Sequence, residues 1–158
     1  MTSIGNYAFY GCTNLESVTI PTKLTKIKVG AFDDCGYYLT TDDGYCEYLK
    51  NTVNGTTKYT LLLTAANYST GSYYVVKDGT TAIANLALQG VGIETIRIPN
   101  TLQVINNQTF YGCPALTKVN FDGTVAEMAT ILGCEATEQA CQDAFKALGY
   151  SNVTLSFV

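Results

Sequence analysis

The sequence predicts a solenoid of short coils stacked side by side, with a parallel sheet on one face and a helical cap at the C-terminal end. A nine-residue block recurs four times, three copies run on into a strand-like segment, and helical spacing begins after residue 122. A fixed repeat indicates a solenoid, because each unit buries its apolar face only against its neighbours. The four copies of the block are IGNYAFYGC (4–12), IKVGAFDDC (27–35), IANLALQGV (83–91) and INNQTFYGC (105–113).

The strand-like segments alternate apolar and polar residues. They are LESVTIP (15–21), IETIRIP (93–99) and LTKVNFD (116–122). In the first, Val18 and Ile20 point to one side and Thr19 to the other, as successive side chains in a strand must. Pro21 and Pro99 end their strands, because proline lacks the N–H that a central ladder requires. We therefore expect short parallel strands, one per coil, with the core behind them.

The nine-residue block is expected to form the return side of each coil. Its fifth position is small, so that backbones can approach closely, and its sixth is a large apolar wedge. In the two FYGC copies, the glycines serve as turn residues, and Tyr10 and Tyr111 are the members expected outside. The small residues are Ala8, Ala31, Ala87 and Thr109, and the wedges are Phe9, Phe32, Leu88 and Phe110.

The six cysteines suggest packing more than a disulfide framework. Cys12, Cys35 and Cys113 share the last position of the block, and Val91 replaces them in the remaining copy. Because valine is accepted there, we expect these thiols to be buried, reduced and part of the core. Cys134 and Cys141 lie seven residues apart around an expected helix start and either pair or remain free. Cys46 is left over.

The repeat is similar to that of a known family. Neighbouring copies begin 23 and 22 residues apart, and a period of 20 to 29 residues with L-x-x-L-x-L is typical of a leucine-rich repeat. TSIGNYAFYGCTNLESVTIP (2–21) and LQVINNQTFYGCPALTKVNF (102–121) resemble the BspA-type leucine-rich repeat family. The resemblance implies a surface or secreted protein of a host-associated microbe, with a role in adhesion to host proteins or other cells.

We expect a single domain over residues 1–158, with regular repeats at 2–32 and 77–122, an enlarged repeat at 33–76 and a cap at 123–158. The enlarged repeat has strand-like runs at 45–49 and 59–64 around an Asn54-Gly55 turn, which predicts a hairpin. The regular register returns where Val76 takes the place of Ile20 and Lys77 the place of Pro21.

The cap should cover the exposed core of the last coil, as solenoids require. Thr137 is a suitable N-cap, Gly149 fits a helix end, and Ala140, Phe145 and Leu148 can share one face. A strand-like segment, NVTLSFV (152–158), follows. At the other end the chain opens within a repeat, so we expect it to be part of a longer protein.

Composition argues against several function classes. A net charge of −4, without a cluster of Lys and Arg, disfavours nucleic-acid binding. The sequence contains no run of about 18 apolar residues, so we do not expect membrane insertion. The chain has no histidine and no Cys-x-x-Cys, and neither Asp33-Asp34 nor Asp42-Asp43 belongs to a calcium loop, so no metal or other cofactor is expected. Without histidine or a recurring carboxylate pair, we expect no enzyme activity.

The leading functional prediction is a cell-surface or secreted adhesion module that binds a host or neighbouring-cell protein, with a glycan as a second possibility. Two alternatives are a structural spacer or stalk and a carbohydrate-binding module. Stacked strands form a continuous surface that solenoids use for binding, and tyrosine is enriched at interfaces. The expected partner-binding residues lie on the non-core, concave side of the strands and in the enlarged repeat: Ser17, Thr19, Thr95, Arg97, Lys118, Asn120, Tyr73 and Tyr74.

Overall fold

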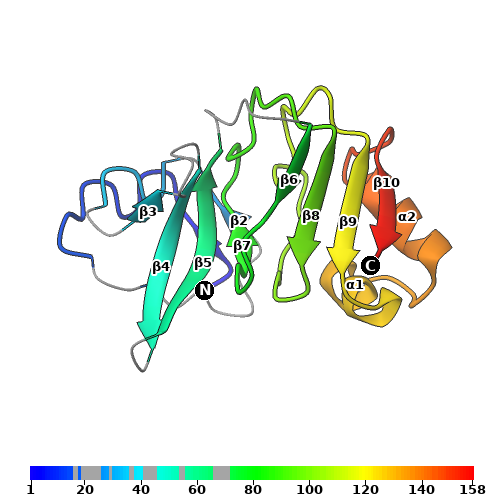
Figure 1. The fold of residues 1–158 in the computed structure, drawn as a ribbon, viewed down its shortest axis with the longest axis horizontal. Coiled ribbons are helices and arrows are strands. Elements are labelled where there is room, and N and C mark those ends of the chain that lie inside the picture. Colours follow the sequence, from blue (N-terminus) through cyan, green and yellow to red (C-terminus); the bar gives the residue numbers. More distant parts are fainter. Residues whose placement is uncertain are drawn as a thin grey trace.

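The structure is a computed structural model, and it describes residues 1–15, 18, 26–28, 30–35, 38–40, 46–53, 56–65 and 72–158. Short strands follow one another across the molecule, and the two helices lie at the C-terminal end (Figure 1). A parallel pair of two-residue strands, β1 (Ser3–Ile4) and β2 (Lys26–Ile27), begins the array. The predicted solenoid of parallel strands is confirmed.

The main sheet contains four parallel strands in the order β6, β8, β9, β10. Their bounds are Tyr73–Val75, Thr95–Pro99, Lys118–Asp122 and Thr154–Phe157. Alternation places every second residue in the core: Tyr74, Ile96, Val119 and Leu155 form one buried row across the sheet. Pro99 is the last residue of β8, as the missing N–H predicts.

The return sides of successive coils are joined by backbone hydrogen bonds. The Phe9 N–H donates to the Ala31 oxygen at 2.8 Å, and the Gly90 N–H donates to the Gly112 oxygen at 2.8 Å. The wedges Phe32, Leu88 and Phe110 are buried as predicted, while Phe9 is half-buried. The eighth position of all four blocks has positive φ, and in three of them it is a glycine, which adopts this conformation without a Cβ clash.

Two of the thiols that end a block, Cys35 and Cys113, do more than fill space. Cys35 donates to the Phe9 oxygen at 3.0 Å, and Cys113 donates to the Leu88 oxygen at 2.9 Å, so each thiol contacts the wedge residue of an earlier block. Cys35 is buried and Cys113 half-buried. The prediction of a buried thiol is wrong for Cys12, which is exposed because no earlier coil lies against it among the described residues.

The enlarged repeat forms the predicted hairpin. Strands β4 (Glu47–Val53) and β5 (Thr56–Thr64) are antiparallel, with β3 (Tyr38–Thr40) on one side and β7 (Ala82–Ile83) parallel to β5 on the other. Both hairpin strands extend closer to the turn than the sequence predicts, and the Asn54-Gly55 turn itself lies outside the described residues. Because β5 pairs with β7 in parallel, the hairpin is joined to the solenoid through β5.

The cap consists of α1 (Val125–Leu132), α2 (Glu138–Ala147) and β10. Thr137 caps α2 as predicted, accepting from the Ala140 N–H, and Gly149 follows the helix with positive φ. Thr124 and Glu127 form a capping box at the start of α1, which was not among the predicted features. Of the predicted α2 face, Phe145 is buried, whereas Ala140 and Leu148 are half-buried.

Candidate functional site

The main sheet brings residues from four strands into two adjacent rows on its non-core face, which we call the outer sheet face. Strand register aligns Thr95 with Lys118 and Arg97 with Asn120, so these four predicted residues lie together. Both rows extend onto β6 and β10. The first row is Tyr73, Thr95, Lys118 and Thr154, and the second is Val75, Arg97, Asn120 and Ser156.

The other predicted partner-binding residues have different placements. Ser17 and Thr19 lie outside the described residues. Tyr73 is on the outer sheet face, 46% exposed. Tyr74 is not on this face: it is only 6% exposed because neighbouring strand residues point to opposite sides of a sheet. Its hydroxyl shares a hydrogen bond with that of buried Tyr48 in β4, so Tyr74 ties the hairpin to the main sheet.

The outer sheet face changes in character from β6 to β10. At β6, Tyr73 and Val75 offer exposed apolar area. Lys118 on β9 is exposed and cationic, whereas the β10 positions carry only hydroxyls, those of Thr154 and Ser156. Val75, Thr154 and Ser156 also lie on this face and were not among the predicted residues. The alternation in NVTLSFV was the signal for the two β10 residues, but it does not reveal that β10 pairs with β9.

Arg97 is held in place at the centre of this face. Its Nε donates to Asp122 Oδ1 at 2.6 Å, and the two side chains are 41% and 24% exposed. The hydrogen bond and charge of Asp122, followed by a hydrogen bond with Tyr73, raise the pKa of Arg97 above its ordinary value. Guanidinium carries five N–H donors, so a fixed Arg97 still has donors to offer a partner.

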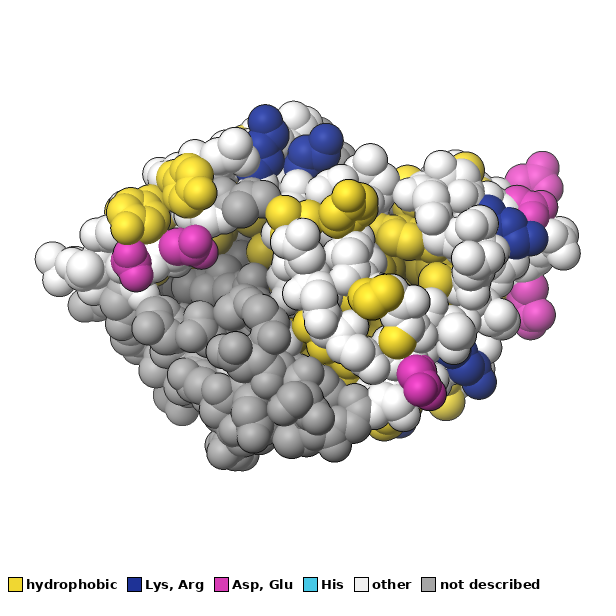
Figure 2. All heavy atoms as spheres, turned by 90° about the horizontal axis from the view of Figure 1, so that it is seen from above, with side chains coloured by type: hydrophobic (Ala, Val, Ile, Leu, Met, Phe, Trp, Pro, Cys, Tyr) yellow, Lys and Arg dark blue, Asp and Glu magenta, His cyan; other side chains and the backbone are white. Residues whose placement is uncertain are grey.

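Charge does not dominate the surface elsewhere. On the side of the molecule seen in Figure 2, Lys, Arg, Asp and Glu side chains are scattered singly or in small groups among uncharged atoms. Within the described part of the chain, no three His, Cys, Asp or Glu side chains gather in a way that could hold a metal ion. On this side of the molecule, the described residues therefore form no large patch of one charge.

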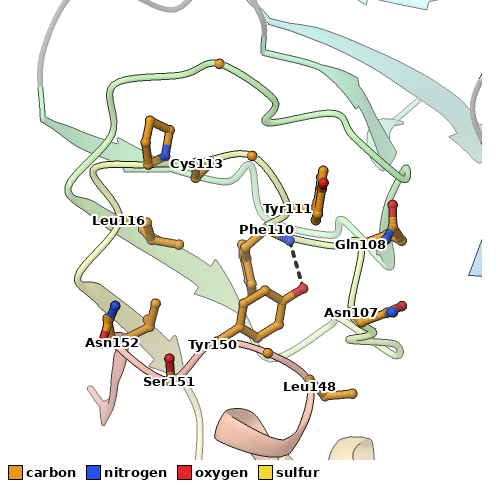
Figure 3. A pocket seen from close by; sticks show the side chains of 15 residues that line it. Asn107, Gln108, Phe110, Tyr111, Cys113, Leu116, Leu148, Tyr150, Ser151 and Asn152 are labelled. Atoms are coloured by element: carbon orange, nitrogen blue, oxygen red, sulfur yellow. Dashed lines mark hydrogen bonds between the residues drawn. The ribbon is translucent and has the colours of Figure 1, made fainter.

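A second feature is a hollow of about 600 Å³ between the last regular block and the cap (Figure 3). Residues 107–108, 110–114 and 116 form one side, together with Gly90, and residues 148–153 form the other. The Tyr150 hydroxyl points at the block, accepting from the Phe110 N–H at 3.1 Å and donating to the Asn106 oxygen. None of the lining residues is Lys, Arg, Asp or Glu.

Comparison with known protein families matches residues 1–43 and 67–151 to the BspA type leucine rich repeat region, in six copies. The chain belongs to this family. No curated protein and no solved structure matched it. The match covers the regular repeats and both ends of the enlarged repeat, and it continues past residue 122 into the segment predicted as the cap.

Membership confirms the predicted leucine-rich solenoid and places the chain among repeat-based interaction or surface modules. Leucine-rich solenoids are typically non-catalytic scaffolds, and BspA-type repeat proteins are typically surface or secreted proteins. Within the described residues, neither helix has the length and apolar character needed to cross a membrane. The outer sheet face and the hollow beside the cap are thus two candidate binding sites on one BspA-type scaffold.

Proposed function

We propose that this chain is the non-catalytic adhesion module of a cell-surface or secreted protein, and that it binds a host or neighbouring-cell protein through the outer sheet face. The observation that carries the proposal is the alignment of side chains from four separate strands into two rows of exposed and half-buried residues. Stacked strands hold these side chains at a spacing of about 4.8 Å, so little ordering entropy is lost on binding.

The composition of the face suits a protein partner. An exposed tyrosine beside a valine supplies apolar contact, and a positioned arginine supplies directional donors. Tyrosine and arginine are enriched at protein interfaces and among the residues that contribute most to binding. A patch that combines an apolar edge on β6 with the exposed Lys118 on β9 and an arginine paired with Asp122 matches a partner surface that carries an apolar side chain next to a carboxylate.

The proposal is tested by measuring binding of the chain to immobilised extracellular-matrix and serum proteins and to whole epithelial cells. We expect saturable binding to at least one of them, weakened about tenfold or more by Tyr73→Ser combined with Lys118→Glu. Lys146→Glu, which makes the same charge change on α2, is the matched control and should leave binding unchanged. Absence of saturable binding throughout the panel would instead support a spacer or stalk role.

A further inference from the structure

The hollow beside the cap lies where a following coil would otherwise pack. In the earlier blocks, the Gly11 N–H donates to the Asp33 oxygen at 3.0 Å and the Gly90 N–H to the Gly112 oxygen at 2.8 Å. The last block has the cap in front of it instead. Tyr150 satisfies the Phe110 N–H, but the Gly112 N–H has no acceptor among the described residues. The wall of the hollow therefore carries an unpaired backbone donor.

The walls combine uncharged polar groups with one exposed ring. Carboxamide and hydroxyl groups come from Asn107, Gln108, Ser151 and Asn152, on both sides of the hollow. Tyr111 lies on the block side and is 53% exposed. Since no charged side chain lines the hollow, it offers no compensation for the lost hydration of an ionic ligand. A neutral ligand with many hydroxyls and one apolar face fits this set.

We propose that the hollow binds a neutral saccharide of one or two sugar rings. The C–H groups on one face of a pyranose can pack on the exposed Tyr111 ring, while its hydroxyls exchange hydrogen bonds with the carboxamides and the Gly112 N–H. A volume of about 600 Å³ is within the range of small-ligand sites. An extended peptide fits less well, because one unpaired N–H cannot support a backbone ladder.

The purified chain is titrated with maltose, cellobiose and lactose, with sialyllactose as the charged counterpart of lactose. Binding is followed by calorimetry and by amide shifts in ¹⁵N-labelled protein. We expect saturation by at least one neutral disaccharide below about 10 mM, with the Gly112 and Ser151 amides shifting and the Thr95 and Asn120 amides unmoved. Because the reporters lie at different sites, this result is independent of whether the outer sheet face binds a protein.

Tyr111→Ala should weaken the saccharide at least about tenfold through lost ring contact. Tyr10→Ala is the matched control, because Tyr10 occupies the same block position, is 56% exposed and does not line the hollow. The proposal is overturned if no neutral disaccharide saturates, if sialyllactose binds more tightly than lactose, or if Tyr111→Ala binds as well as the unaltered chain.

An independent observation concerns the loop between the two cap helices. Cys134 Sγ and Cys141 Sγ are 3.8 Å apart, which is contact distance for two thiols. Cys134 is fixed by a hydrogen bond from its N–H to the Ala129 oxygen at 3.1 Å, and Cys141 lies in the first half of α2. Cys134 is half-buried and Cys141 is buried. The more accessible sulfur is therefore Cys134.

We infer that Cys134 and Cys141 form a disulfide when the chain meets a small-molecule disulfide such as oxidised glutathione. The Cys134 thiolate attacks one glutathione sulfur, and the other glutathione leaves as a thiolate that takes up a proton. Cys141 then loses its proton and attacks Cys134 Sγ, which releases the second glutathione. Two cysteine thiols are thereby oxidised to one disulfide, and one oxidised glutathione is reduced to two thiols.

Incubation with oxidised glutathione should lower the intact mass by two hydrogens and remove two alkylatable thiols, and peptide mapping should find the link between residues 134 and 141. Dithiothreitol should reverse it, and the melting temperature should rise by about 5 °C on oxidation. Cys12→Ser should not affect the reaction, whereas Cys134→Ser should abolish it. Alkylation of both Cys134 and Cys141 after oxidation, or a persistent glutathione adduct at Cys134, would overturn the inference.

Discussion

The two copies of FYGC, at 9–12 and 110–113, have the same sequence in different surroundings. In the first block, Phe9 is half-buried and stacks on Phe32, with ring centroids 5.0 Å apart, while Cys12 is exposed. In the last block, Phe110 is buried among wedge and cap residues, 5.9 Å from Phe145 and 5.4 Å from Tyr150. Both copies have the same local sequence. How much each residue contributes to stability depends on what packs against its block, which is the following coil for the first copy and the cap for the last.

The largest expected difference between the copies is at the wedge. Phe110→Ala removes a buried ring that packs against Phe145 and Tyr150 and should lower the free energy of unfolding by about 3–5 kcal/mol. Phe9→Ala should cost less than half as much, because its ring is already partly in water. Urea denaturation of both variants measures the difference. Equal losses would mean that the first block is more completely covered than the structure shows.

Tyr150→Phe tests how the cap closes the last block. The variant keeps the ring but removes the hydroxyl that bonds the Phe110 N–H and the Asn106 oxygen. Leaving the buried Phe110 N–H without this acceptor should lower the unfolding free energy by about 2 kcal/mol. Tyr111→Phe removes a hydroxyl from an exposed ring and serves as the control in the same denaturation experiment. A neutral Tyr150→Phe would show that water replaces the hydroxyl.

The turn glycines differ in the space around them. Gly11 and Gly112 both have positive φ, 69° and 76°. A Cβ on Gly112 would lie 2.8 Å from Gln89 Cγ and 3.3 Å from its Cα, whereas nothing lies within 4 Å of one on Gly11. Gly11→Ala should therefore cost about 1 kcal/mol from backbone strain alone, and Gly112→Ala about 2 kcal/mol. Thermal unfolding of the two variants compares them, and a larger loss at Gly11 would contradict this account.

The smallest effect concerns ionisation at the end of the block. Burial raises the pKa of the Cys113 thiol from 9.0 to about 11. As the pH rises, the unfolded chain therefore releases this proton before the folded chain does. The contribution of the protonated Cys113 thiol to the free energy of unfolding is fully present below pH 9 and is lost between pH 9 and about pH 11. After allowance for solvent screening, we expect about 1 kcal/mol. Cys113→Val should reduce the fall in unfolding free energy over this interval, and Cys12→Val should not. Identical pH profiles for the two variants would contradict the burial of Cys113.

Much of the coil was predictable from sequence because its physical determinants lie within one repeat. Strand alternation identifies Ile96 and Val119 as core residues and Thr95 and Lys118 as their outward neighbours, and one repeat length sets the register between them. Thr137 was identifiable as an N-cap for the same reason, since its acceptor role involves a backbone group three residues away. The predicted wedge residues follow from spacing within the block.

The candidate sites were only partly predictable. Thr95, Arg97, Lys118 and Asn120 could be placed on one face from the pattern, but Tyr74 could not be separated from Tyr73 without the exact register of β6. The hollow depends on Tyr150 reaching a block 40 residues earlier in the chain. No local sequence pattern specifies such a contact, and the length of the loop in the cap does not predict where the Tyr150 side chain points.

The sequence alone determined the architecture of this BspA-type protein: coils, wedges, turn glycines and the alternation that creates an outer face. These features depend on steric and hydrophobic preferences that act within about one repeat, so they recur wherever the pattern recurs. The tertiary structure alone decided which thiol is covered, which tyrosine is buried, and where a hollow remains beside the cap. Those outcomes depend on what packs against the end of each coil, and the packing residues come from distant parts of the chain.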